Sequence, residues 1–238
     1  DGWRQYGFDL DGRASTKEST DLCRPLAGGA AAQVYPDGDD GIDNAFGKLL
    51  LPIVLGFMPD ASVQVDGMVA EGRYTLLIHL TDVGDGDAYD PVRTLVYEGA
   101  PRGEPPLFDG TDAWSVRPES LADPADLGTA RNQFPEGYVT AGVWVSGFGD
   151  LTIELPASSY ALEPGQWFRV PFRLRRAIVS LPLASGDSEW KGGIVAGILD
   201  VEELILDLND RAGYFDYSAG CGGGTTASIM NQIRQAAA

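Results

Sequence analysis

Turn-forming residues are spread along the whole chain, and they limit the length of any regular element. Of the 238 residues, 31 are glycine and 15 are proline, which is about a fifth of the total. This much Gly and Pro favours many short elements joined by turns over a few long helices. With 44% hydrophobic residues, the chain is large enough to bury one sizeable core. We therefore expect a single domain over residues 1–238.

The clearest β-strand signal covers residues 74–81, where alternate side chains are apolar and the pattern has a period of two. Further short segments, most of them bounded by Gly, Pro or Asp, also predict strands: 94–97, 138–146, 151–155, 167–174, 177–183 and 193–199. Short strands with turns between them favour sheet-on-sheet packing. The predicted fold class is mainly β or α+β, an antiparallel β-sandwich-like core with two or three peripheral helices.

The first predicted helix follows residue 45. Apolar side chains between Phe46 and Phe57 recur at the spacing of one helical stripe. Asp43 is placed to cap this helix, and Pro52 is expected to kink or end it. A weaker helical pattern extends to Glu71.

Two more helices are predicted near the C-terminal end of the sequence. Residues 201–208 are amphipathic, and Asp200 with Glu203 three residues later resembles a capping box. A last helix is expected to begin at Thr225 or Thr226. Residues 1–41 are predicted to form an irregular N-terminal arm packed on the domain, and residues 101–136 a long loop that is functional or covers a sheet edge.

The charge of the chain excludes one class of function. There are 35 acidic and 17 basic side chains, which gives a formal net charge of −18. Such a protein would be repelled by nucleic acid, and by an anionic membrane surface as well. The longest apolar stretch, residues 49–58, is shorter than the roughly 20 residues of a spanning helix. We expect neither nucleic-acid binding nor a membrane span.

The composition favours a secreted or cell-envelope protein, extracellular or periplasmic. The chain begins with Asp1 and has no apolar leader, which is typical of a mature, processed product. Abundant Asp with almost no Lys suits a saline or calcium-rich medium. Cys23 and Cys221 are the two cysteines, and they predict either one disulfide that closes a long loop or two buried thiols.

The most distinctive acidic segment is residues 37–44. Closely spaced Asp and Asn side chains separated by glycine can turn several oxygens toward a calcium ion. The leading candidate ligands are Asp37, Asp39, Asp40, Asp43 and Asn44. The segment does not match an EF-hand loop, because glycine comes one position early and Lys48 stands where the bidentate Glu belongs. The alternative interpretation is a solvated turn before a capped helix.

Two smaller acidic groups could complete that calcium site or form others. Asp9 and Asp11 precede Gly12. A second group follows the strongest predicted strand and consists of Asp82, Asp85, Asp87 and Asp90. Acidic loops at strand ends bind calcium in extracellular β proteins, but they are also ordinary solvated loops.

Catalytic motifs are scarce. The one histidine, His79, lies in the predicted strand 74–81 and fits a structural role better than that of a base. Ser146 lacks the first glycine of a nucleophile elbow, and the glycine-rich run 220–226 lacks the lysine of a phosphate loop. A carboxylate pair for glycoside hydrolysis cannot be chosen from 35 acids. Trp144 and Trp167 fit a core, whereas three other tryptophans are candidates for exposed contact: Trp3, Trp114 and Trp190.

Four segments carry a resemblance to a known family: residues 8–12 (FDLDG), 41–48 (GIDNAFGK), 108–112 (FDGTD) and 142–147 (GVWVSG). Together they resemble a family of uncharacterised bacterial secreted proteins and putative lipoproteins. The resemblance implies an envelope or extracellular location and supplies no catalytic residue. The first residue is Asp1, not the Cys that would be lipidated in a lipoprotein.

Three functions remain open from the sequence. The first is a secreted, noncatalytic protein, stabilised by calcium, that recognises a glycan or another cell-surface component. The second is a structural protein that assembles with copies of itself outside the cell. The third is a secreted hydrolase with a carboxylate pair. Whether the protein is an enzyme is uncertain, and the lack of catalytic motifs favours a binding role.

Overall fold

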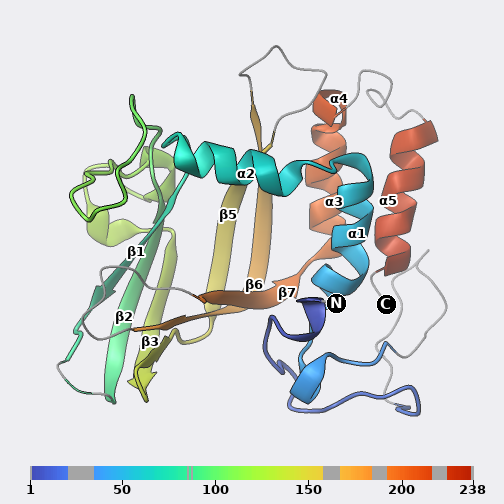
Figure 1. The fold of residues 1–238 in the computed structure, drawn as a ribbon, viewed down its shortest axis with the longest axis horizontal. Helices are drawn as coiled ribbons and strands as arrows, with labels where there is room; N and C mark the ends of the chain where they lie inside the picture. The colour runs from blue at the N-terminus through green and yellow to red at the C-terminus, as the bar shows by residue number, and fades with distance from the viewer. Residues whose placement is uncertain are drawn as a thin grey trace. The chain divides into compact units, whose positions relative to one another are not determined.

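The computed structural model describes residues 2–20, 35–84, 86, 88–157, 167–183, 192–215 and 224–236 (Figure 1). The chain divides into two compact units. The first comprises Asp1–Ser62, Leu155–Pro171 and Leu199–Ala238, and the second Val63–Glu154 and Phe172–Ile198. The single domain over residues 1–238 stays a prediction. Cys23 and Cys221 lie outside the described residues, so their bridge stays a prediction as well.

The strands of the described residues form a seven-stranded antiparallel sheet in the order β1-β2-β3-β4-β6-β5, with β7 paired to β6. Their bounds are β1 Leu76–Thr81, β2 Tyr89–Glu98, β3 Asn132–Thr140, β4 Val143–Val145, β5 Gly149–Ala157, β6 Phe168–Pro182 and β7 Ile194–Leu199. This sheet and its helices confirm the predicted mainly β, α+β class. All the strands belong to one hydrogen-bonded sheet.

Several strand boundaries differ from the sequence prediction, and backbone conformation explains two of the differences. Residues 138–146 were predicted as one strand, but Ala141 (φ 48°) and Gly142 (φ 72°) form a tight turn between β3 and β4. Left-handed conformations at both central residues are typical of a two-residue hairpin turn. Conversely, β6 runs through both the 167–174 and the 177–183 segments, with Arg176 (φ 48°) between them. A bulged residue of this kind bends a strand without ending it.

The core of the second unit has two parts. The larger cluster is built from side chains of β2 to β6: Val92, Val96, Phe134, Val139, Trp144, Leu151, Ala177 and Val179. The smaller one is Leu95, Tyr97, Leu121 and Ala130, with Leu77 and Val116 against it. Because alternate residues of β2 enter different clusters, this strand is buried on both faces. Residues 101–136 were predicted as a long loop that is functional or covers a sheet edge. This segment supplies Leu121 and Ala130 to the second cluster, but the prediction is wrong from Asn132 on, where β3 begins.

Five α-helices occur among the described residues, where two or three were expected: α1 Leu51–Phe57, α2 Ala61–Ala70, α3 Val201–Asp210, α4 Ala212–Phe215 and α5 Gly224–Ala236. In the first unit, α5 lies beside both α3 and α1 (Figure 1). Buried side chains of this unit include Leu50, Leu204, Ile205, Met230 and Ile233. Glu202 on α3 accepts two hydrogen bonds from Arg234 on α5, at 2.7 and 2.8 Å.

The first predicted helix begins differently from the expectation. A π-helical turn, Phe46–Leu50, precedes α1, and Pro52 falls in the first turn of α1, where its missing N–H costs no hydrogen bond. The predicted cap is also wrong. Asn44 Oδ1 accepts the Gly47 N–H at 2.6 Å, while Asp43 Oδ2 accepts the Leu10 N–H at 2.7 Å.

The C-terminal predictions are confirmed. Asp200 caps α3 by accepting the Glu202 and Glu203 N–H groups at 3.0 and 3.1 Å. The last helix, α5, begins at Gly224, one residue before the earlier of the two predicted starts. Within the described part of the chain, no one helix is long and apolar enough to cross a membrane, and only a pair bent by 90°, Phe46–Gly56 with Ala61–Ala70, passes that test together.

Candidate functional site

Three carboxylates of the first unit come together from two segments far apart in sequence. Oxygen atoms of Asp9, Asp11 and Asp43 all lie within 4.8 Å of one another. Asp9 and Asp11 are exposed, and Asp43 is half-buried. Asp43 belongs to the leading group of predicted calcium ligands, and Asp9 and Asp11 to one of the two smaller groups that could complete that site or form others. The structure thus joins the two groups at one point.

Local hydrogen bonds set the positions of these three carboxylates. Asp9 Oδ1 accepts the N–H groups of Gly12 and Arg13 at 2.6 and 3.1 Å, and Asp11 Oδ1 accepts that of Arg13 at 2.9 Å. Gly12 has φ +77°, a conformation that a glycine adopts without strain. Asp43 is held from two sides, because its own N–H donates to Phe8 O at 2.9 Å and its carboxylate accepts from Leu10.

Burial and neighbouring charge both act on Asp43. Its pKa is raised by desolvation, and the negative charges of Asp11 and Asp37 raise it further, against the lowering effect of the Leu10 N–H. A divalent cation would relieve the repulsion among these carboxylates. Calcium takes six to eight oxygen ligands, and carboxylates are among those it prefers. Asp9, Asp11 and Asp43 are thus three carboxylates of the kind that a divalent cation such as calcium prefers.

The other predicted calcium ligands have different surroundings. Asp37 Oδ2 accepts the Ser15 N–H, and Asp39 forms a 2.8 Å ion pair with Arg4. Asp40 is exposed with φ 56°, and Asn44 caps the π-helical turn. Asp82 is exposed at the end of β1, whereas Asp85 and Asp87 lie outside the described residues. The metal-ligand group found among the described residues contains none of these.

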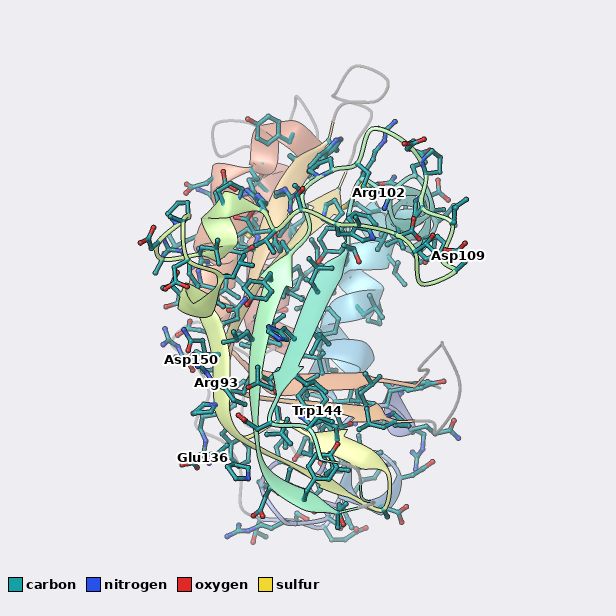
Figure 2. All side chains as sticks on the ribbon, turned by 90° about the vertical axis from the view of Figure 1, so that its left-hand side faces the viewer. Arg93, Arg102, Asp109, Glu136, Trp144 and Asp150 are labelled. Atoms are coloured by element: carbon teal, nitrogen blue, oxygen red, sulfur yellow. The ribbon has the colours of Figure 1, made fainter. Side chains whose placement is uncertain are left out.

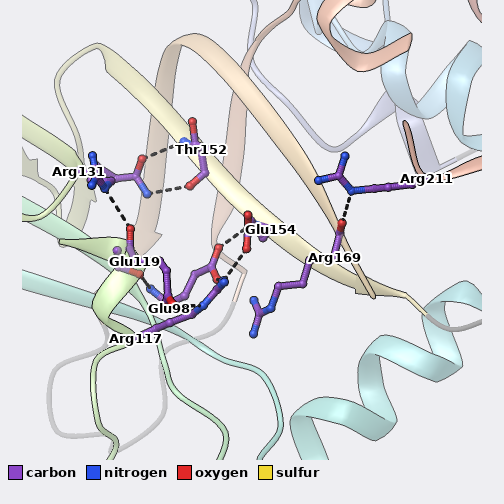
Figure 3. A network of polar contacts seen from close by, with 10 residues as sticks. Glu98, Arg117, Glu119, Arg131, Thr152, Glu154, Arg169 and Arg211 are labelled. Carbon is purple, nitrogen blue, oxygen red and sulfur yellow. Dashed lines mark hydrogen bonds and ion pairs between the residues drawn. The ribbon is translucent and has the colours of Figure 1, made fainter. Parts of the chain in front are cut away.

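A second charged group, in the second unit, lies largely out of solvent. Arg117 Nη1 donates to Glu98 Oε2 at 2.7 Å and also to Glu154 Oε2 (Figure 3). Glu98 Oε1 accepts the Glu154 backbone N–H at 2.7 Å. Burial lowers the pKa of Arg117, but hydrogen bonds and attraction from Glu154 and Glu98 outweigh it and raise the pKa. Both oxygens of Glu98 are thus engaged, so the group fits stabilisation better than glycoside hydrolysis.

A loop of the second unit, residues 102–114, presents two apolar side chains to solvent, and we call it the 102–114 loop. Leu107 and Phe108 are 73% and 66% exposed. Figure 2 shows Asp109 at the outer end of this loop and Arg102 nearer the sheet. Exposed apolar residues that lie together rather than singly can mark a contact surface.

Hydrogen bonds hold the 102–114 loop in one conformation. Asp112 accepts the N–H groups of Leu107 and Phe108 at 3.0 and 2.7 Å, and pairs with Arg102 at 3.1 Å. The guanidinium of Arg102 also lies 5.4 Å from the ring centre of Trp114. The hydroxyl and the N–H of Thr111 bind Asp109 and lower its pKa. The exposed pair therefore sits on a loop fixed from both sides.

The tryptophans and the histidine are placed as follows. Trp144 is fully buried, as predicted, and Trp167 is half-buried beneath Arg169. Trp3 lies beneath Arg4 and Lys48, and the half-buried Trp114 beneath Arg102, whereas Trp190 lies outside the described residues. His79 is exposed on β1. Sequence reasoning missed Leu107 and Phe108, although an apolar pair between Pro105–Pro106 and an Asp/Gly turn is a signal that could have found them.

Comparisons with protein-family models, with curated proteins and with solved structures give no match to this chain. The resemblance to bacterial secreted proteins and putative lipoproteins therefore stays a prediction.

Proposed function

We propose that this is a noncatalytic binding protein, secreted or located in the cell envelope, that recognises a cell-surface component through the 102–114 loop. A calcium ion bound by Asp9, Asp11 and Asp43 stabilises its N-terminal arm. The observation that carries the proposal is the exposed pair Leu107 and Phe108 on a loop fixed by Asp112 and Arg102.

A fixed loop is suited to binding because little conformational entropy is lost when a partner is engaged. Phe108 has φ 54°, a conformation that is uncommon outside glycine and that the Asp112 hydrogen bonds help to hold. Two apolar side chains side by side fit an apolar pocket, where contact residues contribute most of the binding energy. The partner we infer is a cell-surface component with such a pocket. A glycan is the alternative partner.

The location rests on the composition and on the resemblance. The −18 net charge of the chain favours repulsion from nucleic acid and anionic lipid, so both are poor partners. The excess of Asp over Lys suits an extracellular medium, and calcium is abundant there. The described carboxylate pair Glu98 and Glu154 is committed to Arg117, so this pair does not support the hydrolase alternative.

Replacing both Leu107 and Phe108 with serine is expected to weaken binding to the cell-surface component by about tenfold or more, since one buried contact residue contributes on the order of 1–2 kcal/mol. The probe is the labelled protein on intact bacterial cells and on a glycan array. The melting temperature should stay within about 2 °C, because both side chains are already exposed.

Leu127→Ser is the matched control, because Leu127 is also apolar and exposed but lies outside the 102–114 loop. This variant should bind like the unmodified protein. Equal binding by the double variant would contradict the proposed surface. Turnover in a glycan, ester and peptide hydrolase screen, lost on a single carboxylate change, would contradict the noncatalytic function.

Calcium is expected to raise the stability of the protein. A ligand at a hundredfold excess over its Kd stabilises the folded state by about 2.7 kcal/mol. For a chain of this size that corresponds to a rise of about 5–10 °C in melting temperature. Thermal unfolding followed by circular dichroism in chelator and in millimolar calcium measures this difference.

Asp11→Asn and Asp43→Asn should each abolish most of the calcium-dependent shift, because each removes one of the three carboxylates. Asp82→Asn, at an exposed Asp outside the triad, is the control and should keep the shift. Identical melting curves of the unmodified protein in chelator and in calcium would rule out the site.

A further inference from the structure

Three strands of the described sheet have one paired neighbour each: β1, β5 and β7. Of these, β1 and β5 differ sharply in the contacts along their outer edges. Side chains replace a neighbouring strand along β5. The Asn132 amide bonds both the N–H and the C=O of Thr152 at 2.8 Å, and Glu98 accepts the Glu154 N–H at 2.7 Å (Figure 3). These contacts satisfy the outer backbone groups of β5 at Thr152 and Glu154, so this edge offers little to another chain.

The outer edge of β1 has no paired strand among the described residues. The Gly99 N–H donates to Thr75 O at 3.0 Å, which places Thr75 in a hydrogen-bonded pair with β2. Bonded and non-bonded pairs alternate along an antiparallel ladder. In the observed register, Leu77, His79 and Thr81 are therefore bonded to β2. The N–H and C=O groups of the alternate residues, Leu76, Ile78 and Leu80, are directed away from it.

β1 also lacks the features by which proteins normally protect a strand edge. Charged residues, proline, bulges and glycine break the pairing of an exposed edge with another chain. The sequence of β1, LLIHLT, contains no charged residue, proline or glycine. Ile78, at its centre, is 41% exposed. An apolar edge of this kind is a template for one more antiparallel strand.

We propose that two copies of this chain associate through β1, antiparallel, with a two-fold axis at Ile78. In this register each Ile78 faces the Ile78 of the second copy, and each Leu76 faces a Leu80. The residues that meet are the ones whose backbone groups point outward, so about six new backbone hydrogen bonds form. Paired strands about a two-fold axis use the same edge in both copies, and the assembly closes as a dimer.

The charges at the two ends of β1 favour the same arrangement. Arg73 precedes the strand and the exposed Asp82 follows it. An antiparallel two-fold pair brings the start of one β1 beside the end of the other, so each Arg73 lies next to the Asp82 of the second copy. Arg73 is paired with Glu71 at 2.8 Å on an exposed surface, where such a bridge contributes little and leaves the guanidinium able to bind again.

The dimer should be weak, because one strand edge buries far less surface than a permanent interface. Repulsion between two chains of net charge −18 opposes it, but at physiological ionic strength charges more than about 8 Å apart are largely screened. The proposal uses none of the residues of the 102–114 loop and does not depend on binding of a cell-surface component. It gives a concrete form to the self-assembling extracellular protein considered from the sequence.

Sedimentation equilibrium of the full chain, at physiological salt and over about a hundredfold range of concentration, tests the dimer, since weak interfaces appear only at high concentration. We expect a monomer–dimer equilibrium that Ile78→Pro weakens by about tenfold or more, because proline removes an outward N–H and leaves the β2 ladder intact. Ile78→Lys places like charges at the axis and should do the same. If Ile78→Pro does not fold, the dimerisation of Ile78→Lys tests the proposal.

Val195→Lys is the control, because Val195 is a similarly exposed apolar strand residue, on β7. It should dimerise like the unmodified protein. Arg73→Gln and Asp82→Asn should each weaken the dimer, and the double variant should be no weaker than the worse single one. A monomer at every concentration, a dimer that both Ile78 variants keep, or growth into larger particles would overturn the proposal.

The register has its own test. Residues facing each other in a hydrogen-bonded antiparallel pair have Cα atoms about 5.5 Å apart, close enough for a short bis-maleimide reagent to join two cysteine side chains. Ile78→Cys should therefore form a covalent dimer with such a reagent. The unmodified chain sets the background from Cys23 and Cys221, and Val195→Cys controls for random collision. Cross-linking of Ile78→Cys no greater than that of Val195→Cys would overturn the two-fold axis at Ile78.

Discussion

Replacing Glu98 with alanine is expected to lower the free energy of unfolding by about 2–4 kcal/mol. Glu98 is 6% exposed and accepts hydrogen bonds from Arg117 and from the backbone N–H of Glu154. Alanine would leave that N–H without its acceptor and would remove one of the carboxylates that neutralise Arg117. Such losses are costly because water cannot reach the groups left behind. Urea denaturation followed by fluorescence measures the change.

Glu119→Ala is the matched control, because Glu119 also pairs with Arg117, at 3.1 Å, but its side chain is 67% exposed. An exposed ion pair contributes about 0–1 kcal/mol, so this variant should lose little. Glu98→Gln should fall between the two, since its amide oxygen can still accept the Glu154 N–H. A loss in Glu98→Ala as small as that in Glu119→Ala would show that the group does not support the fold.

The hydrogen bonds of Glu98 and Asn132 also explain why the outer edges of β1 and β5 differ. Glu98 lies at the end of β2, and Asn132 at the start of β3, yet both bond the backbone of β5. Their side chains stand in for a strand that would otherwise pair with β5. No comparable side-chain contact lies along β1 in the described residues, apart from a weak bond from Thr75 Oγ1 to Leu76 O at 3.5 Å. The β5 edge is thus closed within the chain at these residues, whereas the outer edge of β1 has no such closing contact in the described residues.

Elements with a strong local pattern were predictable from the sequence. The alternation over residues 74–81 gave β1, and the Asp200 cap with an amphipathic stripe gave α3. Boundaries that depend on single backbone conformations were not. Ala141 carries no signal for a left-handed turn, so β3 and β4 read as one strand. The strand order could not be predicted at all, because it depends on contacts between residues distant in sequence.

The candidate site was predictable only in part, for the same reason. Acidic groups were visible in sequence, but the meeting of Asp9 and Asp11 with Asp43 depends on how the arm lies along residues 35–48. That path is set by separate bonds, such as Asn44 Nδ2 to Tyr6 O at 2.7 Å. Glu98 gave no signal, because one acid among 35 is recognised as buried only once its partners are known.

Trp144→Ala is expected to lower the free energy of unfolding by about 3–5 kcal/mol, the usual cost of removing a large aromatic side chain from a packed core. Trp144 lies on β4, is 0% exposed, and belongs to the larger core cluster with Phe134 and Val92. Alanine would leave a cavity among residues of several strands, which cannot close around it without moving the sheet. Chemical denaturation measures this loss, provided that the m-value of the variant equals that of the unmodified protein.

A milder substitution separates packing from polarity. Trp144 Nε1 has no hydrogen-bond partner among the described residues, so Trp144→Phe removes volume but also relieves a buried, unpaired N–H. It should therefore cost clearly less than alanine. Phe148→Ala is the control, because Phe148 is an exposed aromatic residue. Its ring lies 5.3 Å from the guanidinium of Arg176, so its removal should lower the free energy of unfolding by about 1 kcal/mol or less. If Trp144→Ala cost no more than Phe148→Ala, the packing of Trp144 in the larger core cluster would contribute nothing to stability.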